Sequence, residues 1–170
     1  MDFRLRRCGP GDETAVSLVA QATILETYAG LAEGSDLYTY VKKDLGVESF
    51  RNLLASERAC AWVIETEVGR CAVGYALLLS GEGAEPYATT ELERFYLLYR
   101  FHGLGLGKRL MDEVLAHARA KRTTLMSLRV NSQNARAIAF YKGYGFKAVA
   151  EEPFRAGERD YRVLVMHLAL

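Results

Sequence analysis

The chain has 170 residues, half of them hydrophobic and a quarter charged, with a formal net charge of +1. This length and composition are typical of a globular protein, and we expect one domain over residues 1–170. A charge this close to zero, with both signs interspersed, gives no basis for binding nucleic acid or a membrane surface.

Targeting segments and metal sites are not indicated by the sequence. The opening stretch MDFRLRRCGPGDE lacks the apolar core of a signal peptide, and the longest apolar run, CAVGYALLL, is too short to span a bilayer. Cys8, Cys60 and Cys71 lack the spacing of metal ligands, so we expect no metal and three thiols in a reducing compartment. These features predict a cytoplasmic protein.

The N-terminal third of the chain is predicted to be largely helical. Alternating apolar residues predict a strand at 3–8, and apolar residues at helical spacing follow over 11–29. A second helix is expected after EGSD, with Ser35 or Asp36 as its cap, and it ends near Leu45. A third, short helix follows.

The rest of the chain alternates between strands and helices. CAWVIETE and CAVGYALLLS flank VGR and predict an antiparallel hairpin, and a polar loop at 81–90 follows. ELERFYLL, TLMSLRV, FKAVAEE and DYRVLVMHL are the later strands. One helix follows the glycines at 103–107, and another spans 132–145, with Asn131 or Ser132 near its cap. This order predicts a mixed α/β sheet with helices on both faces.

Three glycines at period two, Gly103, Gly105 and Gly107, lead into the first of these helices. A helix N-terminus exposes unpaired N–H groups and a partial positive charge, and glycines let a phosphate or diphosphate approach them. Lys108 and Arg109 would add positive charge at the rim. A tight turn with unusual φ angles is the alternative. The spacing fits neither the P-loop nor the dinucleotide fingerprint, which argues against nucleotide hydrolysis.

Two motifs together resemble the GNAT N-acetyltransferases. LERFYLLYRFHGLGLGKRLMDEVL resembles their acyl-CoA-binding motif, in which a strand leads to Gln/Arg-x-x-Gly-x-Gly/Ala and then a helix. VNSQNARAIAFYKGYGF resembles their second motif, Asn-x-x-Ala-x-x-x-Tyr-x-x-x-Gly-Phe. His102 stands at the Gln/Arg position, where the family encloses the pyrophosphate largely through its main chain. The resemblance implies a mostly antiparallel sheet that splays between its central strands, and acetyl-CoA as cosubstrate.

The resemblance also implies which residues hold acetyl-CoA. They are Leu97, Leu98, His102, Gly103, Leu104, Gly105, Leu106, Gly107, Lys108, Asn134 and Tyr141. Leu97 and Leu98 would bind pantetheine through their main chains, as another strand would. Asn134 and Tyr141 are seven residues apart and so share one helix face. By resemblance, Asn134 would bind the pantetheine, and Tyr141 would be the general acid that protonates the leaving thiolate.

A primary ammonium must lose a proton before it attacks, at a cost of about 4–5 kcal/mol at pH 7. A carboxylate that acts directly or through water could take this proton, and Glu93 and Glu91 are the candidates. Strand alternation places them on one face with Phe95 and Leu97. The alternative is that both glutamates are solvated residues at a sheet end.

The acceptor is the open question. The N-terminal helices and the C-terminal strands resemble the bacterial polyamine (spermidine/spermine) N-acetyltransferase branch, and Glu26 and Tyr28 are the expected acceptor contacts. The predicted function is transfer of acetyl from acetyl-CoA to a primary amine of a small molecule, by direct attack in a ternary complex. A protein N-terminal or lysine acetyltransferase, and a CoA-binding regulatory module without catalysis, are the alternatives. The family also implies that a homodimer is an option.

Overall fold

A computed structural model describes residues 2–81, 88–156 and 159–170. Within these ranges the chain forms a seven-stranded sheet in the order β1-β2-β3-β4-β5-β7-β6. Neighbouring strands are antiparallel except for β4 and β5, which run parallel. The predicted mixed, mostly antiparallel sheet is therefore confirmed. Most of the expected loop at 81–90, residues 82–87, lies outside the described residues.

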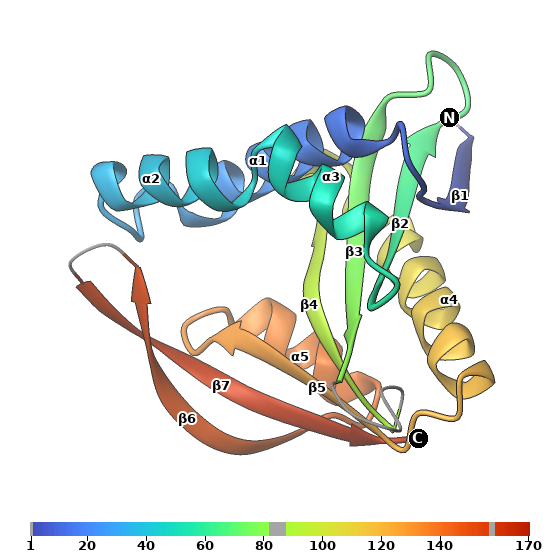
Figure 1. Ribbon diagram of the computed structural model, residues 1–170. Coiled ribbons are helices and arrows are strands. Elements are labelled where there is room, and N and C mark those ends of the chain that lie inside the picture. Colours follow the sequence, from blue (N-terminus) through green and yellow to red (C-terminus); the bar gives the residue numbers. More distant parts are fainter. Residues whose placement is uncertain (1, 82–87, 157–158) are drawn as a thin grey trace.

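The elements follow the predicted order along the chain (Figure 1). The strands are β1 (Phe3–Arg7), β2 (Ala59–Thr66), β3 (Ala72–Ser80), β4 (Thr89–Leu97), β5 (Leu125–Asn131), β6 (Lys147–Ala156) and β7 (Arg159–Ala169). The helices are α1 (Glu13–Tyr28), α2 (Gly34–Asp44), α3 (Val47–Ala55), α4 (Leu106–Ala120) and α5 (Ala135–Gly143), with a 3-10 turn, η1, at Tyr99–Phe101.

Helices cover both faces of the sheet and bury a separate core on each (Figure 1). The core under α1–α3 includes Val16, Ile24, Phe50 and Tyr75. The core under α4 and α5 is larger, and the apolar side predicted for α4 lies fully within it: Leu106, Leu110, Val114, Leu115 and Ala118. The spacing of apolar residues in α4 therefore predicted its buried face correctly.

The two predicted helix caps are wrong, and in both cases tertiary structure sets the boundary. The second helix begins at Gly34 with Glu33 as its N-cap residue, so Asp36 lies inside its first turn. The last helix begins after Asn134, because β5 stays paired with β7 as far as Asn131. Propensity located both helices but not their first residues.

The sheet opens between its two central strands. β4 pairs with β5 over Thr89–Leu92 and Leu125–Leu128, and this pairing then stops. Beyond it, β4 stays beside β3 as far as Leu97, while β5 stays beside β7 as far as Asn131. The predicted splay is thus confirmed, and one edge of β4 is left open to the gap.

A β-bulge in β4 changes which face its residues occupy. Arg94 and Leu92 pair with consecutive residues of β3, which leaves Glu93 as the extra residue. Leu92 therefore packs in the same core as Phe95, although the two are three residues apart. Alternation predicted a common face for Glu91, Glu93, Phe95 and Leu97. That prediction is wrong, because one inserted residue reverses the alternation beyond it.

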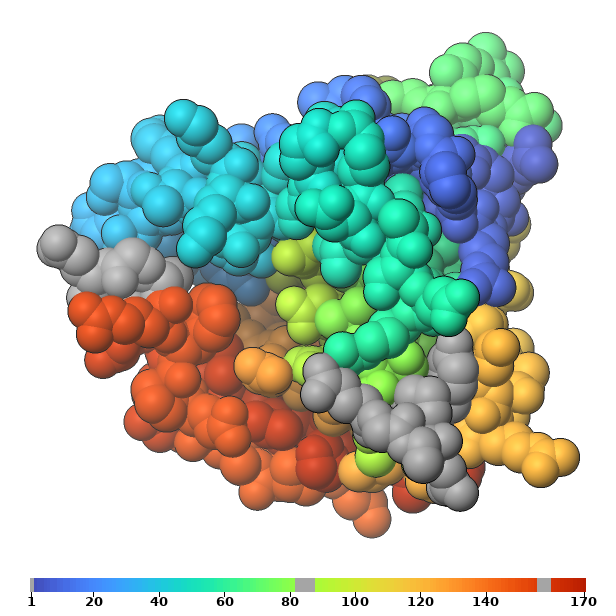
Figure 2. All heavy atoms as spheres, in the orientation of Figure 1, coloured from blue at the N-terminus to red at the C-terminus, as the bar shows by residue number. Residues whose placement is uncertain are grey.

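β6 and β7 form a long hairpin, here called the arm, that reaches toward α2 (Figures 1 and 2). Phe154 of β6 is paired with Tyr161 of β7, and the Tyr161 hydroxyl accepts a hydrogen bond of 3.4 Å from the Glu33 N–H. The arm therefore meets the connection between α1 and α2. Among the described helices, none is long and apolar enough to cross a bilayer.

Candidate active site

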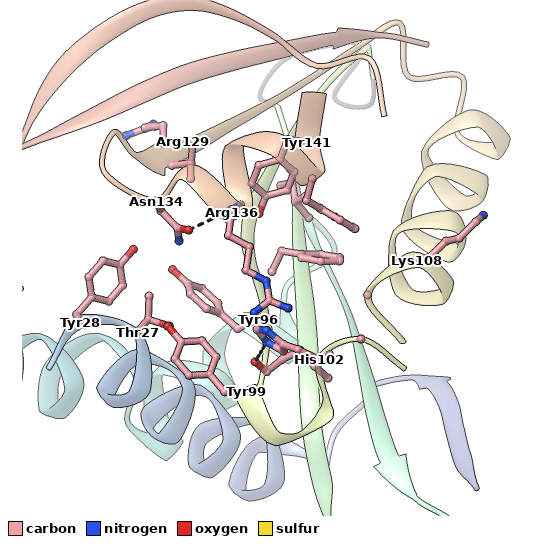
Figure 3. A pocket seen from close by; sticks show the side chains of 18 of the residues that line it. Thr27, Tyr28, Tyr96, Tyr99, His102, Lys108, Arg129, Asn134, Arg136 and Tyr141 are labelled. Carbon is pink, nitrogen blue, oxygen red and sulfur yellow. Dashed lines mark hydrogen bonds between the residues drawn. The ribbon is translucent and has the colours of Figure 1, made fainter. Parts of the chain in front are cut away.

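A cleft of about 460 Å³ lies where β4 and β5 diverge, between the end of α1, the start of α4 and one face of α5 (Figure 3). The predicted site residues that line it are Tyr28, Glu93, Leu97, His102, Gly103, Gly105, Gly107, Lys108, Asn134 and Tyr141. These residues come from five separate segments, and the splay of the sheet brings them to one place.

The start of α4 presents main-chain donors to this cleft. Because Arg109 N–H donates to Gly105 O at 3.1 Å, the N–H groups of Leu106, Gly107 and Lys108 precede the hydrogen-bond ladder of the helix. The N-cap residue, Gly105, has no side chain that could accept a hydrogen bond from these groups. They are therefore left to water or to a ligand, and the helix dipole favours an anion.

Glycine occupies positions 103, 105 and 107 for different physical reasons. Gly103 and Gly105 adopt φ angles of 80° and 75°, which disfavour other residues. Gly107 has no such φ angle, and a Cβ built on it would meet the nearest described atoms, in the ring of Phe140, at an ordinary 3.8 Å. Neither backbone conformation nor packing requires glycine at 107. Close approach of a ligand to the main chain is the remaining reason.

Positive charge reaches the cleft from α5 rather than from Lys108. The Lys108 ammonium pairs with Asp112 at 2.9 Å on the outer side of α4, and its side chain points away from the cleft (Figure 3). Arg136, the second residue of α5, lines the cleft instead. Arg136 was not predicted from the sequence, because it occupies a variable position of the second motif. Of the other predicted contacts, Leu106 is buried in the core and Leu104 is exposed outside the cleft lining.

The open edge of β4 is defined by its pairing with β3. Leu98 N–H donates to Val73 O at 2.9 Å, so alternation turns the main-chain groups of Leu97 and Phe95 toward the gap. The Leu98 carbonyl accepts from Phe101 N–H at 2.9 Å, so both main-chain groups of Leu98 have protein partners. The main-chain groups that face the gap therefore belong to Leu97 and Phe95, whereas those of Leu98 do not face it.

Tyr141 is held by a cluster of aromatic rings at one wall of the cleft. Phe95, Phe140 and Phe146 lie edge-on to its ring, with centroids 6.3, 5.7 and 5.8 Å away. Burial raises the pKa of the Tyr141 hydroxyl, and the nearby Tyr28 adds to this effect. The hydroxyl therefore keeps its proton at neutral pH and remains a donor.

Asn134 is the N-cap of α5. Its Oδ1 accepts a hydrogen bond of 3.1 Å from Ala137 N–H. The oxygen is thus used to start the helix, while the side-chain NH₂ remains for a ligand in the cleft that Asn134 lines. Asn134 and Tyr141 therefore both face the cleft, although Asn134 precedes the first helical residue.

A second, smaller cleft of about 170 Å³ adjoins the first, between α1, α2, β4 and the arm. Four residues line both clefts and so mark their junction: Tyr28, Glu93, Tyr96 and Arg129. Glu91 lines the second cleft and pairs with Arg129 at 3.1 Å. The surrounding protein and the neighbouring Glu91 raise the pKa of Glu93, which stands at the bulge.

Glu26 lies outside the lining of both clefts. Its Oε2 accepts a hydrogen bond of 2.9 Å from Tyr99 N–H and so braces the turn after β4 against α1. The neighbouring predicted acceptor contact, Tyr28, lines both clefts. Among the described residues, no group of three or more His, Cys, Asp or Glu side chains is arranged to hold a metal.

Comparison with known proteins decides the family. The profile of the acetyltransferase (GNAT) family matches residues 27–146, which include both motifs and the four residues at the junction of the clefts. The chain belongs to this family. The seven-stranded, mostly antiparallel sheet agrees with this assignment.

Relatives match only part of the chain. Uncharacterized N-acetyltransferases of Mycobacterium bovis and Mycobacterium tuberculosis are 40% identical over 99 residues, 56% of this chain. The match spans 60% of the length of these relatives. The 5-NmdU N-acetyltransferase of Pseudomonas phage PaMx11 is 47% identical over 49 residues, 29% of this chain and 33% of the phage protein.

Solved structures share the fold over the full chain. The PaiA N-acetyltransferase of Thermoplasma acidophilum, in complex with coenzyme A, has a TM-score of 0.83 at 20% identity and covers 100% of both chains. YncA of Salmonella typhimurium, with its cofactor acetyl-CoA, has a TM-score of 0.72 at 23% identity, covering 100% of this chain and 95% of YncA. At these identities the likeness establishes the fold.

Proposed function

We propose that this protein transfers the acetyl group of acetyl-CoA to a primary amine of a small molecule, by direct attack in a ternary complex. The observation that carries the proposal is the junction of two clefts. One cleft offers main-chain donors for a diphosphate and an open strand edge, and the other is acidic and aromatic. Glu93 stands between them.

The first cleft suits acetyl-CoA in each of its parts. The unpaired N–H groups at the start of α4, with Arg136 nearby, suit the charged diphosphate. The open edge of β4 suits the amides of pantetheine, which would pair with it as an added strand. The Asn134 NH₂ lines the same cleft and would donate to the pantetheine. Acetyl-CoA would supply the thioester carbonyl at the end of this path.

The chemistry needs one base and one acid, and the first cleft is lined by a candidate for each, Glu93 and Tyr141. Glu93 would accept the proton of the ammonium, directly or through a water, so that the neutral amine attacks the thioester carbonyl. A main-chain N–H of the open β4 edge would stabilise the oxyanion that forms. When the C–S bond breaks, the Tyr141 hydroxyl would give its proton to the departing thiolate. Glu91, held by Arg129, would tune Glu93 rather than act as the base.

The second cleft favours a small, cationic acceptor such as a polyamine. Asp36, Glu91 and Glu93 outnumber the cation Arg129, which is already paired with Glu91. Aromatic rings surround these charges: Tyr28, Tyr40, Tyr96, Phe154 and Tyr161. Carboxylates and ring faces both attract ammonium groups. The three cysteines are free thiols, which suits a reducing, cytoplasmic setting.

Thiol release from acetyl-CoA with a panel of amines tests the proposal. The panel contains putrescine, spermidine, an aminoglycoside and a short peptide with a free N-terminus. We expect turnover with the diamine or polyamine and little with the peptide. Preferential turnover of the peptide would replace the small-molecule acceptor with a protein. Binding of acetyl-CoA by titration calorimetry, with no thiol release from any amine, would instead identify a CoA-binding module.

A further inference from the structure

His102 makes a side-chain contact that its place in the motif does not explain. Its Nε2 lies 2.7 Å from the carbonyl oxygen of Leu97 (Figure 3). A carbonyl oxygen only accepts hydrogen bonds, so Nε2 must carry the proton. Nδ1 is buried and has no hydrogen-bond partner among the described residues. The ring is therefore used as a donor to the main chain through Nε2.

The carbonyl that receives this hydrogen bond belongs to the open edge of β4. Leu98 N–H is bonded to β3, so the Leu97 carbonyl points the other way, toward the gap between β4 and β5. In an unbroken sheet an N–H of the next strand would meet it there. The His102 ring takes that place at the last residue of β4.

The main chain of His102 belongs to the glycine turn that leads into α4. His102 directly precedes Gly103, whose positive φ begins the turn into α4. Its own N–H donates to Tyr99 O at 3.0 Å, and Tyr99 in turn is braced by Glu26 at 2.9 Å. The Tyr99 ring lies edge-on to the imidazole, with centroids 5.0 Å apart. The Tyr99 ring thus packs against the His102 ring, while Nε2 of His102 donates to Leu97 of β4.

We infer that His102 is a positioning residue that fixes the open edge of β4 relative to the glycine turn. A ligand that contacts both the β4 edge and the glycine turn then finds them at a fixed distance and orientation. This inference rests on the proposed binding of acetyl-CoA. The imidazole has two side-chain torsions, whereas Gln or Arg at this position has more to order. The rigid His102 ring therefore makes this hydrogen bond at a lower cost in side-chain entropy than a longer side chain would.

Two substitutions separate the hydrogen bond from the ring. His102→Phe keeps a flat ring but has no donor, and His102→Gln keeps a donor but has no ring. The probes are CoA, which spans both parts of the cleft, and adenosine 3′-phosphate 5′-diphosphate, which lacks pantetheine and reaches only the glycine turn. Calorimetric titration of each variant with each probe gives four affinities to compare with the wild type.

We expect His102→Phe to bind CoA about 5- to 10-fold more weakly and the nucleotide within about 2-fold of the wild type, because one hydrogen bond is lost. His102→Gln should recover most of the CoA affinity. In turnover assays, the KM for acetyl-CoA should rise in His102→Phe by the same factor, with the KM for the amine unchanged.

Each other result counts against a specific claim. An equal loss of affinity for both probes would mean that the substitution damages the turn as a whole. Unchanged affinities would mean that the hydrogen bond does not contribute to binding. Either result overturns the inference and leaves the proposed function standing. Failure of the wild type to bind CoA would overturn the proposed function, and the inference with it. Should His102→Phe fail to fold in a thermal melt, His102→Asn, whose shorter amide cannot reach Leu97, takes its place with the same expectations.

Discussion

The two clefts are built in different ways, although they share one junction. The cofactor half, formed by β4, α4, β5 and α5, offers main-chain groups: the N–H groups that open α4 and the unpaired edge of β4. The acceptor half, formed by α1, α2 and the arm, offers side chains such as Asp36, Tyr40 and Tyr161. Main-chain groups depend on backbone geometry, whereas side-chain contacts change with each substitution. Substitutions should therefore leave ligand binding by the cofactor half largely unchanged, whereas the side chains of the acceptor half should set the specificity for the acceptor.

The largest effect should come from Tyr141→Phe, which removes the proposed acid and keeps the ring in its aromatic cluster. Proton donation by a placed side chain contributes about 10²- to 10⁴-fold, so we expect kcat to fall at least about 100-fold. Acetyl-CoA affinity should stay within about 2-fold, because the main-chain contacts are untouched. Single-turnover assays and calorimetry measure the two quantities.

Tyr144→Phe is the matched control for this substitution. Tyr144 follows α5 directly and is outside the cleft lining, and its hydroxyl donates to Asp112 Oδ1 and to Lys108 O. Its loss should leave kcat within about 2-fold. Equal kcat values for Tyr141→Phe and the wild type would show that the thiolate leaves without help from this hydroxyl.

The cofactor half could be predicted because its signals are local. Gly105, Asn134 and Tyr141 stand at fixed offsets within two short stretches, and these offsets indicate a turn and a helix face, although the cap was expected at Asn131 or Ser132 rather than at Asn134. Arg136 was missed because its role depends on where α5 lies against the splay rather than on its neighbours in sequence.

The acceptor half and the bulge could not be predicted in the same way. The extra residue at Glu93 exists only in the register with β3, which no local pattern reports. Glu26 and Asp36 are both acidic residues near helix ends. Packing of α1 against the turn after β4 assigns Glu26 to a brace, while the early start of α2 turns Asp36 toward the cleft.

The next largest effect should come from Glu93→Gln, at the junction itself. A base works when ionised, so activity rises with pH through the pKa of its carboxyl. Burial and Glu91 raise this pKa above the ordinary value of about 4.3, so the acid limb of kcat/KM should lie at higher pH than for a solvated glutamate. Glu93→Gln should lower kcat/KM about 30-fold at pH 7 and abolish this limb.

Glu91→Gln tests the same electrostatics from the neighbouring position. Removal of its negative charge lowers the pKa of Glu93 and should move the acid limb to lower pH, with kcat at high pH little changed. An acid limb that stays in place in both variants would assign it to a group other than Glu93.

Within the cofactor half, Gly107→Ala and Gly105→Ala should separate the two reasons for glycine. Gly107 has room for a Cβ, so its substitution should leave the fold intact or slightly more stable, yet weaken CoA binding about 10-fold by holding the diphosphate away. Gly105 has a φ of 75°, so its substitution should cost about 1 kcal/mol of folding free energy.

Chemical denaturation and CoA titration of both variants provide the readout. Full CoA affinity in Gly107→Ala would show that the ligand does not approach this main chain closely. The period-two glycines would then be explained by turn geometry alone.

The smallest effect should come from the acceptor half, because its contacts are numerous and individually weak. Asp36→Asn removes one of three carboxylates around the second cleft, so the KM for a diamine should rise about 3- to 5-fold with kcat nearly constant. The KM for a monoamine should hardly change, since it carries no second charge for Asp36 to attract. Asp44→Asn, on the same helix but outside the lining of both clefts, controls for general loss of negative charge. Equal shifts for diamine and monoamine would mean that Asp36 shapes the cleft without recognising a cation, and specificity would then fall to the aromatic rings of the arm.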